Sequence, residues 1–569
     1  MRNLLLTISI LFCININSQS FPGCEGPGCV ATGGSGYLVY KVTNLNDSGT
    51  GSLRQAVSDA GSAGGGNIVF DVSGVINLSS SLTITSASNL TFAGQTAPEG
   101  GITIDGSRVA FIGSSNIVIM HMRFRGGFDY GGDDSLVFKE NATNIVVDHV
   151  STSFGGDESF SIYATGSGQT VDNITISRCI MAESSSSSQI VGALYGTATA
   201  GDIAVHHNLY YNESHRFPNV AGGSTSNFQI SNNIVWTLED RLTRGNGESN
   251  INFEGNYYNY GTRPLIDTRT HLWTGIDGTP PTLYLDGNTI VAANTSTPLT
   301  WTASEMNTDN DRMFGYFLDY NGNSAGDRLP SGYFTSTKNS YGWTYDVTVQ
   351  TSSAAFDDVV ADVGTNKRIN GDGSVSDNTD ALDSAWLSNV DTGTFEDRLS
   401  TGSYAVPSIT SNSRAASYDT DDDGMPDVWE AATFGDLTTD ETTDSDSDGR
   451  TNFQEFIDLV YGEEPSPIAV TGIEWDNDDQ TVEVGGFLDL TLNWSPSNAT
   501  DKGFSLVSSN PSVISNAGAV IGEGTATLTI TTDDGSFTDV MNVTVNAASE
   551  PSPSTGKRIK KGKFILIDY

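Results

Sequence analysis

The chain has 569 residues, with 69 Asp and Glu against 27 Lys and Arg, and its formal net charge is -42. This length exceeds what one ordinary hydrophobic core supports, so we expect three or more structural units. Nucleic-acid binding needs clustered positive charge, so the acidic balance excludes nucleic acid as an expected partner. It suits a soluble monomer in a calcium-rich extracellular setting.

Residues 1–18 have the pattern of a secretory signal peptide. Arg2 supplies the positive start, and LLLTISILFCI supplies an apolar core that is too short for a good membrane anchor. Cys13 leaves lipoprotein processing open, although Phe12 is larger than the residue that such cleavage prefers. No later stretch is long and apolar enough to span a bilayer, so we expect a secreted protein. Retention at the cell surface through its C-terminal region is the alternative.

Three cysteines remain after such cleavage. Cys24 and Cys29 can close a small disulfide loop in an oxidising compartment. Cys179 is left over, and we expect it to be a small buried residue.

A repeat runs through the first half of the chain. Short β-prone runs recur at intervals of 23 to 29 residues, beginning at Asn89, Asn116, Asn144, Asn173, Asp202, Asn227 and Asn250. Periods of this size, with short strands and no helical pattern between them, predict an all-β solenoid, the parallel β-helix. The competing prediction is a β-sandwich, which favours hairpin turns at shorter spacing.

Asparagines recur at one position of this repeat. Asn208, Asn233 and Asn256 each lie six residues after the start of a unit. Stacked coils would align their side chains into a ladder of hydrogen-bonded amides. The stretch TLYLDGNTIV is expected to add another coil, whereas residues 300–410 show no clear pattern.

Two acidic segments, DTDDDGMPDVWE and DSDSDGRTNFQE, have the spacing of an EF-hand calcium loop, with oxygen side chains at positions 1, 3, 5, 9 and 12 and glycine at position 6. We expect residues 415–462 to bind Ca²⁺ structurally, because the ions would order carboxylates that otherwise repel one another. The alternative is an acidic linker. The candidate ligands are Asp419, Asp421, Asp423, Asp427 and Glu430 in the first loop and Asp444, Asp446, Asp448, Asn452 and Glu455 in the second.

The C-terminal part of the chain has a different pattern. Residues 467–546 contain alternating strands that predict a small immunoglobulin-like β-sandwich. A Pro-containing linker precedes it, and residues 547–569 form a second linker and a basic-then-apolar tail.

Acidic residues occur in successive coils of the predicted solenoid. Asp134 ends the run GGDD, and Asp157 and Glu158 follow the next strand, NIVVDHV. Neighbouring coils lie about 4.8 Å apart, so carboxylates at similar positions can share one hard cation. Arg216 lies two coils further on, in HRFPN. A groove that holds Ca²⁺ beside an arginine suits a polyanionic sugar, whose carboxylates must be neutralised.

The histidines near this arginine have different expected roles. His206 and His207 alternate across a strand, so at most one of them faces the groove. We expect packing and hydrogen bonds between coils for this pair and for His149. His215 is expected to line the groove beside Arg216.

Taken together, GDDSL, NIVVDHVSTSFGGDES, ITISRCIMAE and IAVHHNLYYNESHRFPNV resemble the pectate lyases of polysaccharide lyase family one. The resemblance covers roughly residues 20–460, and residues 467–546 resemble a bacterial Ig-like domain. It implies a right-handed parallel β-helix over residues 19–410 that cleaves polygalacturonate, an acidic polysaccharide, by β-elimination with Ca²⁺.

The resemblance also implies roles for individual residues. The arginine of the R-x-P motif is the base, here Arg216. The active-site calcium ligands include Asp134 and Asp157, with either Ser161 or Glu158 as the next ligand. The second arginine of the family motif is Ala221 here. Residues expected to contact substrate are His215, Pro218 and Asn219.

The sequence is also compatible with two other functions. A β-helix hydrolase of the polygalacturonase type would use clustered carboxylates as acid and base, and Asp133, Asp134, Asp157 and Glu158 offer them. A non-catalytic carbohydrate-binding or adhesion protein would use the Ig-like domain. β-Elimination leaves a conjugated product that absorbs ultraviolet light, whereas hydrolysis does not.

Overall fold

The computed structural model describes residues 19–126, 134–184, 191–197, 200–237, 242–261, 273–275, 281–291, 301–316, 327–396, 404–435, 437–462, 470–495, 499 and 502–548. The predicted signal peptide, Asp133 and the C-terminal tail from residue 549 lie outside these residues. The chain divides into two compact units near Ser466, and each is described by itself.

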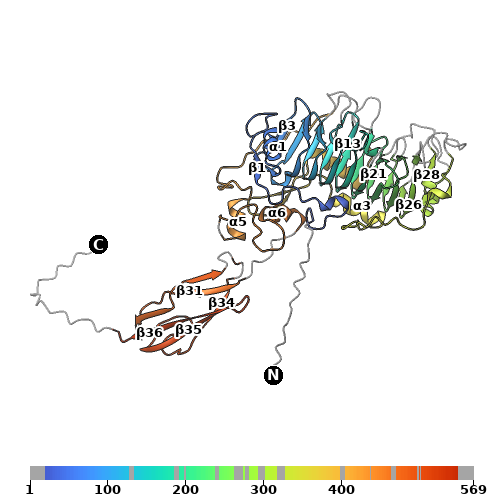
Figure 1. The fold of residues 1–569 in the computed structure, drawn as a ribbon. Helices are drawn as coiled ribbons and strands as arrows, with labels where there is room; N and C mark the ends of the chain where they lie inside the picture. The colour runs from blue at the N-terminus through green and yellow to red at the C-terminus, as the bar shows by residue number, and fades with distance from the viewer. Residues whose placement is uncertain are drawn as a thin grey trace, which may run out of the picture. The chain divides into compact units, whose positions relative to one another are not determined.

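The first unit is a parallel β-solenoid built from three sheets (Figure 1). Sheet A has ten strands: β1 (Val39–Val42), β2 (Gly66–Phe70), β5 (Ser88–Ala93), β8 (Ser115–Met120), β11 (Ala142–Asp148), β14 (Val171–Ser177), β17 (Asp202–His206), β20 (Asn227–Ser231), β23 (Asn250–Glu254) and β26 (Thr282–Asp286). The seven predicted repeat units correspond to β5 through β23, and TLYLDGNTIV adds the coil that contains β26. The predicted solenoid is therefore confirmed, and the sandwich alternative for this region is wrong.

The other two sheets have nine strands each. Sheet B contains β4 (Leu82–Thr85), β7 (Val109–Ile112), β10 (Leu136–Lys139), β13 (Glu158–Ala164), β16 (Val191–Thr197), β19 (Asn219–Ala221), β22 (Thr243–Asn246), β25 (Trp273–Gly275) and β28 (Phe314–Tyr316). Sheet C contains β3 (Gly74–Asn77), β6 (Ile102–Gly106), β9 (Arg123–Gly126), β12 (Ser151–Ser153), β15 (Ile180–Ala182), β18 (Leu209–Tyr211), β21 (Ile234–Trp236), β24 (Tyr257–Asn259) and β27 (Thr289–Val291).

The coils stack in register around a continuous apolar core. Ile117, Ile145, Ile174 and Ile203 pair one above another along sheet A, and all four are fully buried. β-Branched side chains fit the pleated, buried face of a strand. Each such residue contributes about 1.5–3 kcal/mol through burial.

The predicted asparagine ladder is present at the turn between sheets A and C. The Asn208 side-chain amide donates to Asn233 at 2.9 Å, and Asn233 donates to Asn256 at 3.0 Å. The ladder continues through Asn288 and Asn310, at 2.8 and 3.1 Å. These amides satisfy buried backbone groups in the turn, which would otherwise carry a desolvation cost.

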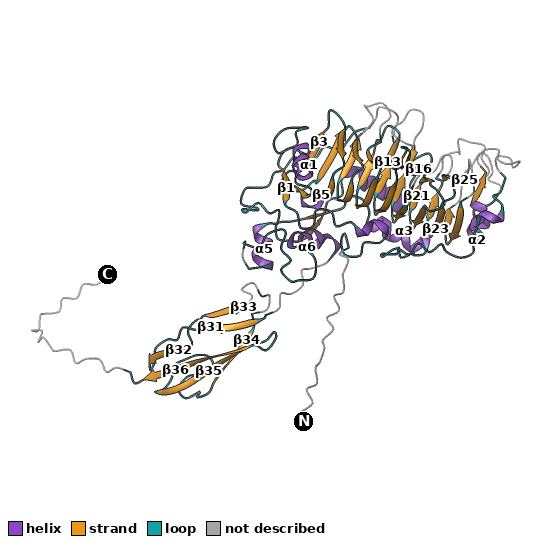
Figure 2. Cartoon of the chain, in the orientation of Figure 1, coloured by secondary structure: helices purple, strands orange, loops and turns teal. Residues whose placement is uncertain are grey.

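Helices cover the solenoid at several places (Figure 2). The segment without a sequence pattern supplies α3 and α4, whose Val359, Trp386 and Val390 pack on Leu209 and Trp236 of sheet C. The disulfide Cys24–Cys29 is formed, and Cys179 is buried and free, as expected. The remaining elements of this unit are η1 (Pro27–Val30), α1 (Leu53–Ser62), η2 (Gly94–Thr96), α2 (Ala303–Thr308), η4 (Asn310–Met313), η5 (Ser331–Tyr333), α3 (Ser352–Ala361), β29 (Lys367–Ile369), β30 (Val375–Asp377), α4 (Ala381–Thr392), α5 (Asp427–Thr433), α6 (Asn452–Asp458) and η6 (Leu459–Tyr461).

The second unit has a small core of its own, which includes Trp475, Leu528 and Met541. A two-stranded sheet pairs β31 with β33, and a four-stranded sheet has the order β32-β36-β35-β34. Within the described part of the chain, no helix has the length and apolar character needed to cross a membrane. The strands are β31 (Gly472–Trp475), β32 (Asp479–Glu483), β33 (Leu492–Ser495), β34 (Phe504–Ser508), β35 (Gly524–Thr532) and β36 (Thr538–Asn546).

Candidate active site and metal sites

Three carboxylates meet at the start of two neighbouring strands of sheet B. Asp134 precedes β10, Asp157 precedes β13, and Glu158 is the first residue of β13; the two strands are paired in parallel. One carboxylate oxygen from each residue lies within 4.8 Å of the others. The Glu158 backbone N–H donates to Asp134 Oδ1 at 3.0 Å, which fixes the two coils together. Hard oxygen donors at this spacing fit Ca²⁺.

Arg216 reaches this acidic cluster from two coils away. It lies in the turn before β19, with φ of 71°, and its Nη1 contacts Glu158 Oε1 and lies 3.9 Å from Asp157 Oδ1. The neighbouring Phe217 is buried in the solenoid core, which anchors the turn. Burial raises the pKa of the Asp157 carboxyl, and the charge of Arg216 opposes that rise.

The other predicted site residues lie on the outer side of the same sheet. In β13, Phe160 and Ile162 enter the core, so Ser161 between them faces outward. Its hydroxyl is buried and has no hydrogen-bond partner among the described residues. Both Ser161 and Asn219 pair with Leu194 of β16, so they occupy one row across the sheet.

His215 and Pro218 belong to the turn that carries Arg216. His215 is half-buried, and its Nδ1 lies 3.4 Å from Ser214 Oγ. The Pro218 carbonyl accepts a hydrogen bond from the Thr243 hydroxyl, so it faces the next coil. The carboxylate cluster and Arg216 therefore come together directly, while His215, Asn219 and Ser161 flank them.

Sequence reasoning missed Glu213, which is fully buried in the Arg216 turn. Its carboxylate accepts hydrogen bonds from the Ser159 hydroxyl at 2.7 Å and from the Ser184 hydroxyl and backbone N–H at 2.6 and 3.0 Å. Burial raises the pKa of Glu213 to about 8, although these hydrogen bonds oppose the rise. Glu213 thereby joins three successive turns beneath the cluster. The only signal in the sequence is an acidic residue near the motif arginine.

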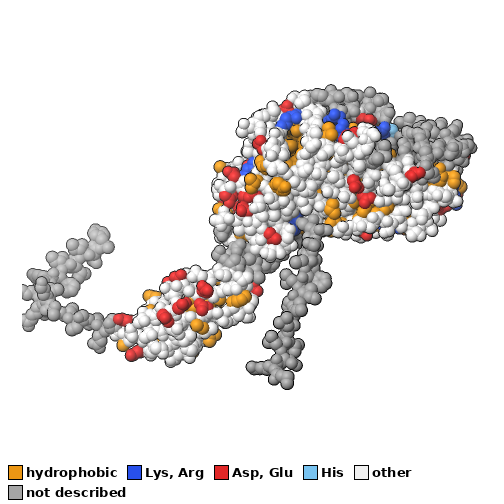
Figure 3. Space-filling view, viewed as in Figure 1, with side chains coloured by type: hydrophobic (Ala, Val, Ile, Leu, Met, Phe, Trp, Pro, Cys, Tyr) orange, Lys and Arg blue, Asp and Glu red, His pale blue; other side chains and the backbone are white. Residues whose placement is uncertain are grey.

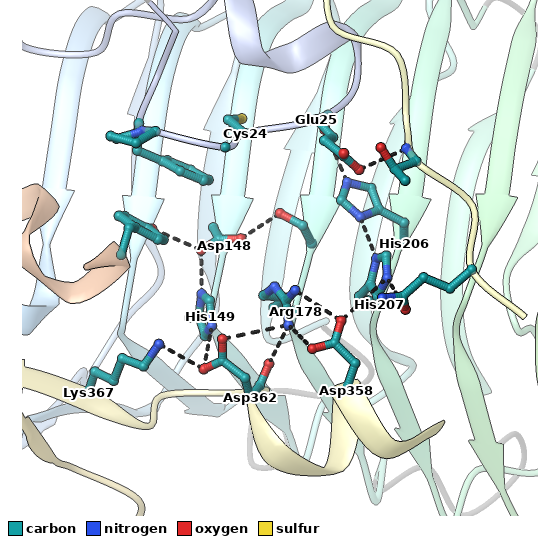
Figure 4. Close-up of a pocket in the computed structure, with 17 residues that line it drawn as sticks. Cys24, Glu25, Asp148, His149, Arg178, His206, His207, Asp358, Asp362 and Lys367 are labelled. Atoms are coloured by element: carbon teal, nitrogen blue, oxygen red, sulfur yellow. Dashed lines mark hydrogen bonds and ion pairs between the residues drawn. The ribbon is translucent and has the colours of Figure 1, made fainter. Parts of the chain in front are cut away.

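The histidines predicted to be structural line a separate polar pocket of about 380 Å³ at the ridge between sheets A and C (Figure 4). His149, Arg178 and His207 occupy the same left-handed position in successive turns, with φ of 49°, 49° and 56°. The Nδ1 atoms of His206 and His207 lie 3.0 Å apart. Their surroundings agree with the expectation of packing and hydrogen bonding, and neither ring lies beside Arg216.

A buried ion-pair network closes this pocket. His149 bonds to Asp148 through Nδ1 and lies 3.2 Å from Asp362 through Nε2. Arg178 pairs with Asp358 at 3.1 Å, and the Tyr461 hydroxyl donates to Asp148 at 2.9 Å. The network therefore ties helix α3 and the 3-10 helix η6 to the solenoid.

The charges of this network make stability depend on pH. Burial alone would raise the pKa of Asp148, but the adjacent imidazolium outweighs it and lowers that pKa to about 2. Burial likewise opposes the charge of His149, but Asp148 and Asp362 raise its pKa. The contribution of Asp148 to the free energy of unfolding is present above about pH 4 and is lost as the pH falls through about 2. The His149 contribution is present below about pH 6.5 and is lost as pH rises through its raised pKa.

Asp148→Asn is therefore expected to lower the free energy of unfolding by about 3 kcal/mol, because it removes one of the two carboxylates that pair with the buried His149. The loss should be largest between about pH 4 and 6.5, where both groups are charged. Thermal unfolding of both proteins across this range measures it. A loss that is independent of pH would contradict the ion-pair account.

Both predicted calcium loops have the same internal hydrogen bonds. The glycine N–H at position 6 donates to the carboxylate at position 1, from Gly424 to Asp419 at 2.8 Å and from Gly449 to Asp444 at 3.0 Å. The side chain at position 9 accepts from the N–H at position 2, in Thr420–Asp427 and Ser445–Asn452. The residue at position 4 is left-handed in both loops.

The carboxylates of these loops converge, and several of their oxygens are buried. Asp421, Asp423 and Glu430 bring oxygens within 4.8 Å of one another, and so do Asp444, Asp446 and Asp448. Glu430 is fully buried, and neither of its carboxylate oxygens has a hydrogen-bond partner in the described part of the chain. The donor set and these buried oxygens fit Ca²⁺. Asp and Glu side chains also gather over the segment that contains α5 (Figure 3).

Burial and mutual repulsion raise the pKa values of these ligands. Desolvation, followed by the charges of neighbouring aspartates, raises the pKa of Glu430 and of Glu455 to about 9. The pKa of Asp423 rises to about 8 for the same reasons, although the hydrogen bond from the Met425 N–H opposes the rise. A cation would remove the repulsion that these shifts reflect.

The loop segment packs on the first coils of the solenoid. Lys41 of β1 lies 2.8 Å from Asp419 and 2.7 Å from Asp422. The Ser35 hydroxyl donates to Gln454 at 2.8 Å, and the Gln95 side chain donates to the Ile457 carbonyl at 3.2 Å. The folding of the loops and that of the solenoid are therefore connected.

Sequence comparison finds relatives that are named as probable pectate lyases. No family model matches the chain. It is 34% identical over 278 residues to a probable pectate lyase C of Aspergillus oryzae, which covers 47% of this chain and 61% of that protein. It is 36% identical over 254 residues to a probable pectate lyase C of Emericella nidulans, covering 44% and 55%. The chain thus spans less than two thirds of these curated relatives.

Solved structures of similar shape have lower identity. A pectate lyase from a Bacillus species in complex with trigalacturonate has a TM-score of 0.42 at 15% identity, covering 60% of this chain and 98% of that one. A thermostable pectate lyase has a TM-score of 0.43 at 14% identity, covering 62% and 99%.

Proposed function

We propose that this protein is a calcium-dependent polysaccharide lyase that cleaves pectate, or a related uronate polymer, by β-elimination on the outer side of sheet B. The observation that carries the proposal is the contact between Arg216 and a cluster of three carboxylates. The relatives with about 35% identity are named as probable pectate lyases, which supports the same reaction. On the face drawn in Figure 3, Lys and Arg side chains also gather along the upper edge of the solenoid, which suits a polyanion.

The reaction begins at C5 of a uronate, whose proton is only weakly acidic. Ca²⁺ held by Asp134, Asp157 and Glu158 would supply positive charge beside the substrate carboxylate and stabilise the enolate that develops there. Arg216 takes the C5 proton. The C5–H electron pair forms the C4–C5 double bond, and the C4–O pair leaves with the oxygen, which gains a proton from solvent. Asn219 faces outward on the same sheet and orients the sugar by hydrogen bonds.

Arginine is ordinarily a poor general base near neutral pH, because the pKa of its guanidinium, about 12.5 or above, keeps the side chain protonated. The second role compatible with the same geometry is that Arg216 stabilises developing charge while another group takes the proton. The dependence of turnover on pH separates the two roles, because a base must be deprotonated to act and a stabilising cation must be protonated.

The loops at residues 419–430 and 444–455 hold structural Ca²⁺ in this proposal. Their shared hydrogen-bond pattern and the buried oxygens of Glu430 support it. Secretion is supported by the N-terminal sequence pattern and by the Cys24–Cys29 disulfide, because disulfides persist in oxidising compartments.

The second unit is proposed to be an immunoglobulin-like sandwich that contributes no catalytic group. Its two sheets share one core, and the candidate active-site residues all belong to the first unit. Deleting residues 465–569 should therefore leave turnover of soluble polymer within about twofold of the full chain. A large loss of turnover in a truncated protein that unfolds at the usual temperature would contradict the separation of the two units.

The proposed function is tested by incubating the purified full chain with a panel of uronate polysaccharides, with Ca²⁺ or with chelator. We expect new reducing ends from polygalacturonate with Ca²⁺ and almost none with chelator. Binding without cleavage of any polymer would favour the carbohydrate-binding alternative and overturn the proposal.

A further inference from the structure

The Glu158 carboxylate lies at the centre of two interactions that exclude each other. Its Oε1 contacts Arg216 Nη1, and the same carboxylate belongs to the three-residue cluster whose oxygens lie within 4.8 Å. The Glu158 side chain is only 3% exposed, so it has little freedom to serve two cations on different sides. A guanidinium and a divalent ion on one carboxylate would repel each other at close range.

The other two carboxylates are held differently from Glu158. Asp157 is 41% exposed and lies 3.9 Å from Arg216, so it can turn toward a cation without displacing the arginine. Asp134 accepts the Glu158 N–H at 3.0 Å and holds its position beside β13. Glu158, by contrast, is buried and contacts Arg216 through Oε1.

We infer that Arg216 and the groove cation compete for Glu158, so that cation binding releases the guanidinium toward the outer face of sheet B, where Asn219 and Ser161 lie. This inference rests on the proposed function for the identity of the cation and of the site. Under this competition, the proposed lyase reaction would need Ca²⁺ for two reasons. The ion would neutralise the charge of the substrate, and it would release Arg216 from Glu158. Because coupling between two binding events is reciprocal, removing Arg216 must also strengthen cation binding.

The first test measures Ca²⁺ binding to the full chain by calorimetry. Asp134→Asn identifies which binding event belongs to the groove, because it leaves both EF-hand-like loops intact. Arg216→Ala should then tighten that event about tenfold or more, and Arg216→Lys should tighten it less because the ammonium keeps a charge with shorter reach. Unchanged or weaker groove binding in Arg216→Ala would overturn the inference.

The second test follows the arginine itself. An arginine-directed dicarbonyl reagent, with modified peptides quantified by mass spectrometry, should modify Arg216 several-fold faster in Ca²⁺ than in chelator. Arg178 is the matched control, since its side chain is 27% exposed and pairs with Asp358 at 3.1 Å, away from every candidate calcium ligand. Its reactivity should not change, and the calcium effect on Arg216 should vanish in Asp134→Asn. Equal or slower modification of Arg216 in Ca²⁺ would contradict the competition.

These readouts separate the inference from the proposed function. Loss of turnover in Arg216→Ala with unchanged groove affinity would leave the lyase proposal standing and remove the competition. Tighter Ca²⁺ binding in the groove of Arg216→Ala, with normal turnover, would support the competition and remove Arg216 from the proposed lyase chemistry.

Discussion

Arg216→Ala is expected to reduce eliminative cleavage of pectate by roughly 10²- to 10⁴-fold, the range that one acid–base group typically contributes. The side chain contacts Glu158 and lies 3.9 Å from Asp157, so it brings a positive charge to the carboxylate cluster. The anchor Phe217 and the buried Glu213 remain in place, so the turn should keep its fold. Turnover on polygalacturonate at saturating Ca²⁺ measures the effect.

Arg216→Lys is the matched variant, because it keeps the charge and removes the planar fork. It should also be strongly impaired, since an ammonium cannot reproduce the reach or geometry of a guanidinium. Unfolding temperatures of both variants should stay close to that of the unchanged protein. Near-normal turnover in Arg216→Ala would remove this residue from the chemistry, and the acidic cluster would then need a different function.

Disabling both calcium loops should produce the largest loss of stability. A ligand present at 100 times its dissociation constant stabilises the folded state by about 2.7 kcal/mol per site. Asp423→Ala together with Asp448→Ala should therefore lower the free energy of unfolding in Ca²⁺ by about 5 kcal/mol at that concentration. The loops pack on the solenoid through Lys41 and Gln95, so the whole first unit should unfold at a lower temperature.

Turnover at moderate temperature should fall much less than stability, because the loops contribute no group to the Arg216 cluster. Thermal unfolding in Ca²⁺ and in chelator measures the effect. Asp391→Ala is the control, since Asp391 is exposed on α4 and lies outside both loops. If chelator lowers the unfolding temperature of the double variant as much as that of the unchanged protein, the loops do not hold the stabilising ions.

The features that sequence predicted well are those that repeat. The interval between β-prone runs predicted the stacked strands of sheet A, because each coil must return the chain to the same register. The phase of Asn208, Asn233 and Asn256 predicted the ladder for the same reason. The loop ligands are close in sequence, and the EF-hand spacing alone predicts that Asp421, Asp423 and Glu430 converge.

The features that sequence could not predict depend on contacts between distant segments. Helices α3 and α4 cover sheet C through apolar side chains with no solenoid period, so residues 300–410 showed no pattern. The contact of Arg216 with Glu158 joins residues two coils apart and depends on the direction of one turn. The pocket around His149 needs Asp362 and Tyr461, which come from much later in the chain.

Elimination at the proposed Arg216 site must leave an unsaturated sugar at every bond of pectate that is broken. Purified protein is incubated with polygalacturonate and Ca²⁺ while ultraviolet absorbance and new reducing ends are followed in the same sample. The account predicts one unsaturated, absorbing end for each bond broken. New reducing ends without any rise in absorbance would show hydrolysis and contradict it.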